Sequence, residues 1–548
     1  MLIVVAPLRA GDVPPADAVA SAHPLATKAG IEILEQGGNA FDAAVAVTAA
    51  LAVVEPFSSG LGGGGFWLLH RAGDGKQVMI DGRERAPKAA HRQMYLDKNG
   101  EVNKGLSLNG PLAAGIPGIP AGLDYLSANY GRLSLKQSLA PAIRYAREGF
   151  AVSDHYRRMA SFRTDVLNTS PAAAAIFLQD GKVPEPGFVL AQENLARLLE
   201  RMAVQGKSAF YGGETARRLV QGVQAADGIW SLQDLAEYRV VERKPIITEY
   251  RGLRVVSASP PSSGGIVIGQ ALKILEHFDL QAMNSVDRKH HVIEAMRRAF
   301  RDRAVFLGDP DHVHIPVDRL FNEDYLDGLA ITIDPARATP SAELGDTPQL
   351  DQSGTSTTHF SIIDSDGNRV AATLSINLPF GSGFVPPGTG VLLNDEMDDF
   401  AIKPHRPNAY GLVGDEANAV APGKRPLSSM SPTFVETGDR IGILGTPGGS
   451  RIISMVLLGI LDFADGFGPD SWVGRERYHH QYLPDAVQYE KNGLGHYEQE
   501  KLRERGHKLR EINRRYGDMH AILWDRKRGE VSAASDPRGE GEAAVVNH

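Results

Sequence analysis

The residues best suited to chemistry lie in one hydroxyl-rich stretch, residues 353–377, which reads SGTSTTHFSIIDSDGNRVAATLSIN. The runs THFSIID and NRVAATLSIN alternate apolar and polar side chains and are joined by DSDGN, a pattern that predicts a β-hairpin. With DSDGN as the turn, Ile363 pairs with Arg369. The same register places Thr357 opposite Ser375, so that two hydroxyls share one face of the sheet.

A threonine inside a chain is a poor nucleophile, and no histidine or aspartate stands at a fixed spacing that would make it a base for this one. Cleavage of the bond between Ser356 and Thr357 would give Thr357 a free α-amino group. The reference pKa of such a group, about 7.7–8.0, leaves a useful unprotonated fraction near neutral pH. A threonine whose base is its own amine is a recognised class of nucleophile.

The Thr357 hydroxyl could make the cut itself. Its attack on the carbonyl of Ser356 would give an ester by an N-to-O acyl shift, and water would then hydrolyse that ester. The stretch therefore predicts a self-processing nucleophile. The alternative is a solvated polar sheet face built from threonines, which favour strands.

Composition excludes several other classes of protein. The 548 residues include no cysteine, which excludes disulfides, thiolate metal sites and cysteine nucleophiles. A formal net charge of −8 and the absence of a block rich in lysine and arginine argue against nucleic acid as a partner. No apolar run approaches the ~20 residues of a membrane span. The G-x-S-x-G, H-E-x-x-H and P-loop patterns do not occur.

Two further patterns predict packing rather than chemistry. The run GLGGGG, residues 60–65, matches G-x-G-x-x-G, but a helix is expected before it and a strand after it, the reverse of a dinucleotide site. We therefore expect close backbone packing there. His290-His291 and His479-His480 are adjacent pairs whose side chains point in different directions, which favours surface or core histidines over metal ligands.

The expected elements are unevenly distributed along the chain. Helical patterns dominate residues 120–330, and alternating strand patterns dominate beyond residue 357. Near the N-terminus, Asn39 suits the N-cap of an Ala/Val-rich helix that we expect to be buried. The segment PHRPNAYGLVGDEANAVAPGKRP is expected to form a long surface loop, of the kind that often acts as a lid.

Motifs across the chain resemble the γ-glutamyltransferase (γ-glutamyl transpeptidase) family of N-terminal-nucleophile hydrolases. They are EPFSSGLGGGGF, DGRERAP, TTHFS, GVLLNDEMDDF, NAYGLVG, NAVAPGKRPLSSMSPT, GTPGGSRII, and MHAI with AASDPRGEG. The similarity runs from about residue 18 almost to the end. The resemblance implies an α/β (α+β) fold, a four-layer αββα sandwich in which two stacked antiparallel sheets are covered by helices.

The resemblance also implies how the chain is divided. A leader would occupy residues 1–17, a helix-rich large subunit residues 18–356, and a strand-rich small subunit residues 357–548. The two cleavage products would form one intertwined heterodimer. Members of the family are periplasmic or secreted, but the start MLIVVAPLRAGDVPPADA lacks the basic region of a signal peptide. An N-terminus complete as written would indicate the cytoplasm instead.

The resemblance assigns the reacting groups residue by residue. Thr357 would be both the self-cleavage residue and the nucleophile. Ser375, where many relatives carry threonine, would hydrogen-bond it. The backbone N–H groups of Gly448 and Gly449 would form the oxyanion hole, where each donor lowers the barrier by roughly 2.7–4 kcal/mol.

The remaining residues would bind a zwitterionic amino-acid head. Its carboxylate would meet one guanidinium and two hydroxyls, those of Arg83, Ser428 and Ser429. Its ammonium would meet one amide and two carboxylates, those of Asn377, Glu396 and Asp399. Tyr410 would lie on the loop that covers the site. Two departures from the family pattern are Leu378-Pro379, where relatives commonly carry polar residues, and Glu396, where bacterial relatives often carry glutamine.

The implied reaction is ping-pong and requires no metal or organic cofactor. Thr357 attacks the γ-carbonyl of a γ-glutamyl amide such as glutathione, and the acyl-enzyme passes to water or to an amino acid or peptide. The alternatives are a cephalosporin or glutaryl acylase on the same fold, or an unprocessed inactive homologue. Arg83, Asp399 and the paired serines favour a glutamyl group, because a glutaryl group lacks the ammonium.

Overall fold

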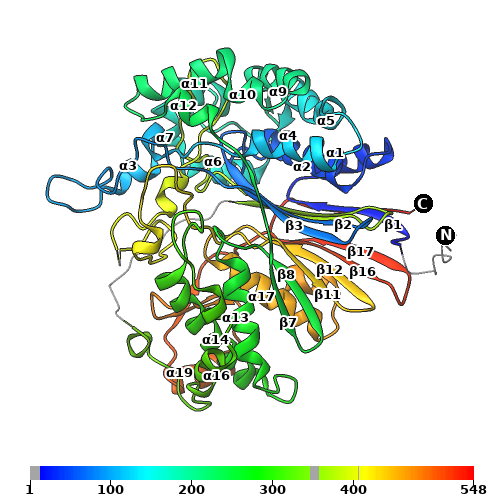
Figure 1. Ribbon diagram of the computed structural model, residues 1–548, viewed down its shortest axis with the longest axis vertical. Coiled ribbons are helices and arrows are strands. Elements are labelled where there is room, and N and C mark those ends of the chain that lie inside the picture. The colour runs from blue at the N-terminus through cyan, green and yellow to red at the C-terminus, as the bar shows by residue number, and fades with distance from the viewer. Residues whose placement is uncertain (1–12, 346–356, 405, 548) are drawn as a thin grey trace, which may run out of the picture.

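The computed structural model describes residues 13–345, 357–404 and 406–547, which form two stacked sheets between two layers of helices (Figure 1). One sheet has seven strands in the order β18-β1-β9-β10-β2-β3-β6, and the other has six in the order β17-β16-β12-β11-β8-β7. All neighbouring strands in both sheets are antiparallel. The predicted αββα sandwich is confirmed.

The seven-stranded sheet consists of β1 (Ala16–Ser21), β2 (Gly64–Arg71), β3 (Lys76–Gly82), β6 (Val241–Arg243), β9 (Thr358–Ile363), β10 (Arg369–Ser375) and β18 (Glu542–Asn547). The six-stranded sheet consists of β7 (Ile246–Tyr250), β8 (Leu253–Ser257), β11 (Thr433–Glu436), β12 (Arg440–Gly445), β16 (His520–Asp525) and β17 (Glu530–Ser535). Two smaller sheets are formed by β4 (Phe150–Ala151) with β5 (Val189–Leu190), and by β13 (Tyr478–His479), β14 (Val487–Glu490) and β15 (Leu509–Ile512).

The helices on the side of the seven-stranded sheet come from the first part of the chain (Figure 1). They are α1 (Pro24–Glu35), α2 (Ala40–Val54), α3 (Lys104–Leu108), α4 (Ile119–Tyr130), α5 (Leu135–Glu148), α6 (Asp154–Ser161), α7 (Thr164–Asn168), α8 (Pro171–Phe177), α9 (Glu193–Gln205), α10 (Ser208–Tyr211), α11 (Gly213–Ala225) and α12 (Leu232–Ala236). The later helices are α13 (Gly264–Glu276), α14 (Ser285–Phe306), α15 (Val317–Leu320), α16 (Glu323–Ile331), α17 (Arg451–Ala464), α18 (Pro469–Gly474) and α19 (His496–Glu504). Of these, α13, α17 and α18 pack on the six-stranded sheet. No helix in the described ranges has the length and apolar character that crossing a membrane demands.

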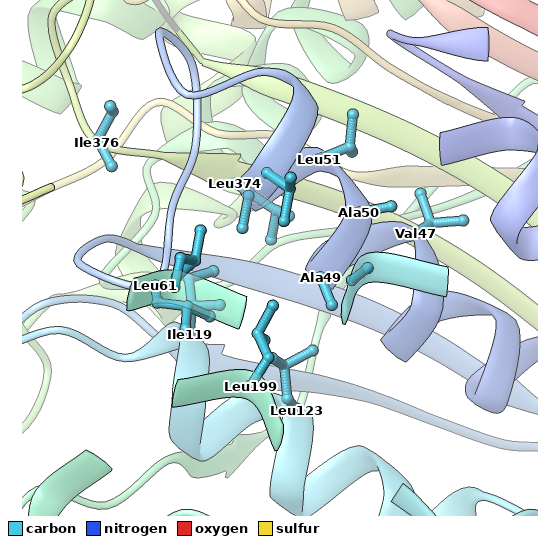
Figure 2. Packing of buried hydrophobic residues seen from close by; sticks show 14 of the residues in the cluster. Val47, Ala49, Ala50, Leu51, Leu61, Ile119, Leu123, Leu199, Leu374 and Ile376 are labelled. Atoms are coloured by element: carbon cyan, nitrogen blue, oxygen red, sulfur yellow. The ribbon is translucent and has the colours of Figure 1, made fainter. Parts of the chain in front are cut away.

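Helix α2 is buried on every side, as its composition predicts. Its N-terminus carries a capping box: the side chain of Asn39 accepts from the backbone N–H of Asp42, and the Asp42 carboxylate accepts from the backbone N–H of Asn39. Figure 2 shows Val47 and Leu51 of this helix in the apolar cluster that also contains Leu374 of β10. Helix α2 therefore supports the hairpin of β9 and β10 through apolar packing.

The hairpin has the predicted register, with Arg369 opposite Ile363. Its turn is tied to α2, because one carboxylate oxygen of Asp364 accepts from the backbone N–H of Ala40 at 2.8 Å and the other accepts from that of Asn368 at 2.8 Å. Gly367 supplies the left-handed backbone that this turn needs, with φ of 90°. The turn and the helix N-terminus thus stabilise each other.

Alternate residues of the hairpin face different layers, as a strand requires. Phe360 and Ile362 join the core under α2, whereas His359 and Ser361 face the six-stranded sheet. Both polar side chains are fully buried. The alternative of a solvated polar face is therefore wrong. A Cβ added at Gly445 of β12 would lie 2.2 Å from the His359 ring, so the absence of a side chain there lets the two sheets close around the imidazole.

The glycine run of residues 60–65 is used for close packing, as expected. A Cβ on Gly62 would lie 2.0 Å from the carbonyl oxygen of Leu392, and one on Gly63 would lie 2.2 Å from that of Ser375. The paired histidines are core residues: His290, His479 and His480 are fully buried, and His291 nearly so. Among the described residues, no cluster of three histidine or acidic side chains is arranged to hold a metal ion.

Candidate active site

A small cavity lies where the hairpin, the loop before α17 and two other loops meet. Its volume is about 20 Å³, room for about one water molecule. Ten of the site residues predicted from the sequence line it: Arg83, Thr357, Ser375, Asn377, Glu396, Asp399, Tyr410, Ser428, Ser429 and Gly449. Gly448 is adjacent in the chain, and Ser356 lies outside the described residues. The cavity is completed by Leu412, Met430, Ser450 and Ile452.

The nucleophile corner is built by the open end of the hairpin. The hydroxyl oxygens of Thr357 and Ser375 are 3.5 Å apart, and both residues are buried. The Ser375 oxygen accepts from the backbone N–H of Asn377 at 2.8 Å, and its hydroxyl also hydrogen-bonds Glu396. Ser375 therefore connects Thr357 to the charged part of the cavity.

The imidazole of His359, two residues after Thr357, belongs to a separate set of contacts. Its nitrogens hydrogen-bond Thr373 at 2.8 Å and Ser361 at 3.2 Å. Burial holds the pKa of His359 well below its usual range, so the ring is neutral. The ring fills space between the two sheets.

Two backbone donors stand at the N-terminus of α17. Neither the N–H of Gly448 nor that of Gly449 donates a hydrogen bond within the described part of the chain. Gly449 has φ of 59°, and a Cβ there would lie 2.3 Å from the ring of Tyr410. Both the left-handed backbone and the close contact with Tyr410 favour glycine at position 449. Free N–H groups at a helix N-terminus favour negative charge, which is what an oxyanion hole needs.

The opposite side of the cavity is strongly charged. Arg83 donates through Nη1 to Glu396 at 2.6 Å and through Nη2 to Asp399 at 2.6 Å. Its Nε donates to the carbonyl oxygen of Pro426 at 3.1 Å, and Glu84 lies 3.4 Å from Nη1. The residues that the sequence analysis gave to opposite ends of a substrate head are thus paired with each other here.

These charges are buried, and their pKa values shift accordingly. Burial opposes the charge of Arg83, but Glu396, Glu84 and Asp399 outweigh it and raise the pKa of Arg83. Burial raises the pKa of Glu396 to about 7, although Arg83 opposes the rise. Glu396 therefore exchanges a proton in the neutral range, which no sequence pattern indicated.

The hydroxyl oxygens of both serines of the predicted carboxylate subsite accept hydrogen bonds from other residues of the protein. The Ser428 hydroxyl oxygen accepts from the backbone N–H of Met430 at 3.1 Å. The Ser429 hydroxyl oxygen accepts from Nη2 of Arg303 at 3.3 Å. Arg303 lies in the last turn of α14 and was missed, because the helical pattern there contains several basic residues and burial is not visible in it.

The segment of residues 404–426 was expected at the surface, and this is wrong for its central part. Tyr410 and Leu412 are buried against the cavity, and the Tyr410 hydroxyl donates to the carbonyl oxygen of Asn377 at 2.7 Å. Gln481, which the sequence analysis also missed, donates to the carbonyl oxygen of Gly411 at 2.9 Å and accepts from the Ser450 hydroxyl at 2.6 Å. Gln481 thereby connects this loop to the segment before α17.

An αββα sandwich with a threonine at the open end of a central hairpin, in one cavity with Gly449 before a helix N-terminus, defines an N-terminal-nucleophile hydrolase fold. The chain belongs to the γ-glutamyltranspeptidase family, whose sequence profile matches residues 26–546.

Curated relatives agree with this assignment. The chain is 43% identical over 525 residues to a glutathione hydrolase proenzyme of Escherichia coli (strain K12), an alignment that covers 95% of this chain and 90% of the relative. It is 44% identical over 483 residues to a glutathione hydrolase proenzyme of Pseudomonas sp. (strain A14), covering 86% and 83% respectively.

Solved structures show the same fold. A cephalosporin acylase from Bacillus halodurans superimposes with a TM-score of 0.86 at 29% identity, covering 99% of this chain and 98% of the acylase. The γ-glutamyltranspeptidase of Helicobacter pylori superimposes with a TM-score of 0.58 at 38% identity, covering 62% of this chain and 96% of the solved chain.

Proposed function

We propose that the protein is a self-processing γ-glutamyltransferase and glutathione hydrolase, which cleaves γ-glutamyl amides through an acyl-enzyme on Thr357. One observation supports this proposal beyond family membership: a single cavity is lined by Thr357, by Gly449 next to Gly448 in the chain, and by a buried cluster of opposite charges. The hydroxyl and donors suit acyl transfer, and the charges suit an amino-acid head. A γ-glutamyl group presents both features at the two ends of a short chain.

In the proposed mechanism, cleavage before Thr357 frees its α-amine, which accepts the hydroxyl proton as the oxygen attacks the γ-carbonyl. Ser375 orients the attacking oxygen, and the N–H groups of Gly448 and Gly449 receive the developing oxyanion. The ammonium then gives its proton to the departing amine. Water or an amino acid or peptide acceptor enters by the reverse sequence and releases the glutamyl group.

The head of the substrate is proposed to lie against the charged side of the cavity. Its carboxylate would contact Arg83, Ser428 and Ser429, and its ammonium would contact Asn377, Glu396 and Asp399. Because Arg83 already pairs with Glu396 and Asp399, the two ends of the head would insert between existing partners. The cavity has room for about one water molecule, and we propose that the segment at Tyr410 moves to admit the substrate.

We propose that the mature protein is a heterodimer of residues 18–356 and 357–548, with residues 1–17 as a leader and a periplasmic or secreted location. The strand order supports the pairing of products. In the seven-stranded sheet β9, β10 and β18 lie among strands from before residue 346, and in the six-stranded sheet β11 pairs with β8. The proenzyme names of the bacterial relatives support processing.

A second candidate is an acylase that removes a glutaryl or related side chain. The similarity to the Bacillus halodurans acylase favours it, as does 35% identity to the acylase ACY 1 proenzyme of Pseudomonas sp. (strain SE83) over 96% of this chain and 93% of the relative. The charged cluster argues against it, because Arg83 faces three acids, and a glutaryl group brings no ammonium to offset the excess negative charge.

Anilide hydrolysis separates the two candidates. We expect γ-glutamyl-p-nitroanilide to be cleaved at least 100-fold faster than glutaryl-p-nitroanilide, since an unpaired buried charge costs several kcal/mol. Equal rates, or a preference for the glutaryl compound, would reject the glutamyl assignment. Intact mass spectrometry tests the processing. The mass of 59.0 kDa divided in proportion to 356 and 192 of 548 residues gives about 38 and about 21 kDa, before any leader is removed.

A further inference from the structure

The proposed carboxylate subsite lacks uncommitted positive charge. All three nitrogens of the Arg83 guanidinium have partners: Pro426, Glu396 and Asp399. Glu84 is buried beside them. A substrate carboxylate would add a further negative charge next to one arginine that already faces three acids. Another cation is needed close by for such a group to bind in a buried place.

Arg303 is placed to be that cation. It is 4% exposed, and no carboxylate in the described residues lies within 4 Å of it. Arg297 and Arg298, on the same helix and equally buried, both pair with Glu294. Asp399 raises the pKa of Arg303 against burial but lies beyond ion-pair distance. A buried guanidinium without an ion-pair partner is costly, so an anionic ligand would stabilise it. Burial lowers the pKa of Arg303 to about 10, so the side chain stays positive at neutral pH.

The hydrogen bonds of Arg303 lead to both serines of the subsite. Its Nη2 donates to the Ser429 hydroxyl oxygen at 3.3 Å, and its Nε donates to the Ser263 hydroxyl oxygen at 2.9 Å. Ser263 in turn donates to the carbonyl oxygen of Ser428, from its hydroxyl at 2.7 Å and from its backbone N–H at 2.8 Å. Arg303 thus holds Ser429 directly and Ser428 through one intermediate.

These hydrogen bonds also determine whether each serine hydroxyl acts as donor or acceptor. A guanidinium can only donate, so the Ser429 oxygen acts as the acceptor and its own proton is left for another partner. The Ser428 oxygen likewise accepts, from the backbone N–H of Met430. Ser428 and Ser429 both line the cavity. Because both hydroxyl oxygens already accept a hydrogen bond from the protein, both hydroxyl protons are available to be donated to an anion in the cavity.

We propose that Arg303 is a positioning residue of the α-carboxylate subsite, which supplies the second positive charge there and directs the Ser428 and Ser429 hydroxyls toward the substrate carboxylate. The inference rests on the proposed function and adds a residue to it. Arg303 acts by orienting the serines and through the electrostatic field of its positive charge. Arg83, in contrast, is paired with Glu396 and Asp399, the acids proposed to bind the ammonium.

The test compares Arg303→Gln and Arg303→Lys with the wild-type enzyme on two substrates. One is γ-glutamyl-p-nitroanilide, and the other is 4-aminobutyryl-p-nitroanilide, which differs only in lacking the α-carboxylate. We expect Arg303→Gln to raise KM for the first about 10- to 100-fold with a smaller change in kcat, the range of a hydrogen bond to a charged group. On the second substrate kcat/KM should change less than threefold. Arg303→Lys should recover part of the loss, because it restores the positive charge but not the planar guanidinium with its several N–H donors.

Arg298→Gln is the matched control, a buried arginine on the same helix whose contacts are Glu294, Leu329, Thr332 and Thr339. It should lower the unfolding temperature and leave the ratio of the two substrates unchanged. Ser263→Ala is the second variant, in case Arg303→Gln does not fold. It keeps Arg303 and the backbone N–H bond to Ser428, but it removes the hydroxyl through which Arg303 is linked to Ser428. It should raise KM only for the substrate with a carboxylate.

Equal losses on both anilides, or an unchanged KM in a folded and self-cleaved variant, would overturn the inference. A wild-type enzyme that fails to cleave γ-glutamyl-p-nitroanilide would instead overturn the proposed function. The two failures are therefore distinguishable in one set of assays.

Discussion

The two sides of the cavity are built in different ways. The nucleophile side comes from one hairpin, in which a turn held by Asp364 sets a register that brings Thr357 to Ser375. The charged side is gathered from distant parts of the chain: Arg83 after β3, Arg303 on α14, Glu396 and Asp399 in a short 3₁₀ turn, and Ser428 and Ser429 before β11. Local geometry fixes the first side, whereas the second exists only once both sheets and their helices have assembled.

This difference predicts that damage on the two sides will differ in kind. Changes on the hairpin should affect processing and the chemical step. Changes on the charged side should affect mainly the binding of the amino-acid head, in a chain that still folds and cleaves itself.

The largest effect is expected for Thr357→Ala. Without the hydroxyl neither the acyl shift nor the acyl-enzyme can form, so the chain should remain one band on a denaturing gel and turnover should fall about 10⁴- to 10⁶-fold. Thr357→Ser keeps a hydroxyl and an amine and should retain both activities at a reduced level. A variant Thr357→Ala that appears as two bands would show that another group makes the cut.

Asp399→Asn should come next. The substitution removes one charge from the Arg83 cluster and from the proposed ammonium contact. Because truncation of one partner of a buried charge pair costs about 2–5 kcal/mol, KM for a γ-glutamyl anilide should rise at least about 30-fold. Self-cleavage should persist. The control is Asp366→Asn, an exposed ion pair with Arg132 at the far end of the hairpin, which should leave kinetics unchanged. Loss of self-cleavage in Asp399→Asn would show that the two sides are not separable.

Gly449→Ala should have an intermediate effect, because it touches the boundary between the sides. The new Cβ would meet the Tyr410 ring in a left-handed backbone, so either the lid or the oxyanion donor must shift. We expect kcat to fall about 10- to 100-fold, within the range for one oxyanion donor. Gly438→Ala, in the open turn between β11 and β12, is the control. If both variants keep wild-type kcat, the segment around Gly449 is not the oxyanion site.

The smallest effect is expected for Glu396→Gln, and it should show in the pH profile. Burial raises the pKa of Glu396 to about 7, and only its ionised form attracts an ammonium. In the wild type, kcat/KM should therefore rise with pH as both Glu396 and the Thr357 amine lose protons, so that log(kcat/KM) approaches a slope of two on the acid side. Glu396→Gln should leave a slope of one, from the amine alone. An unchanged dependence of log(kcat/KM) on pH in Glu396→Gln would show that Glu396 does not contact the substrate ammonium.

The sequence predicted the hairpin side well, and the reason is physical. The period-two pattern and the DSDGN turn determine a register without reference to any other part of the chain. The buried α2 helix could be predicted in the same way from its unbroken Ala/Val composition. The residues of the charged side came only from resemblance to a family, because no local pattern connects Arg83 to Asp399 or to Ser428.

What the sequence missed depends on burial. The lid segment contains many loop-forming residues, so it was expected at the surface, yet Tyr410 and Leu412 insert into the cavity. Arg303 was one basic residue among several on a helix, and its lack of an ion-pair partner among the described residues becomes apparent only in three dimensions. The direct pairing of Arg83 with both acids likewise depends on distances that no spacing encodes.

The interleaving of strands from before residue 346 and after residue 356 in both sheets has a consequence for the lifetime of the mature enzyme. A precursor that unfolds can recover by itself, since its ends stay tethered. Once the bond is cut, recovery becomes an encounter between two dissolved polypeptides, each with exposed sheet edges that invite aggregation. The lifetime of the mature form would then be set by its rate of unfolding, and its denaturation would be irreversible.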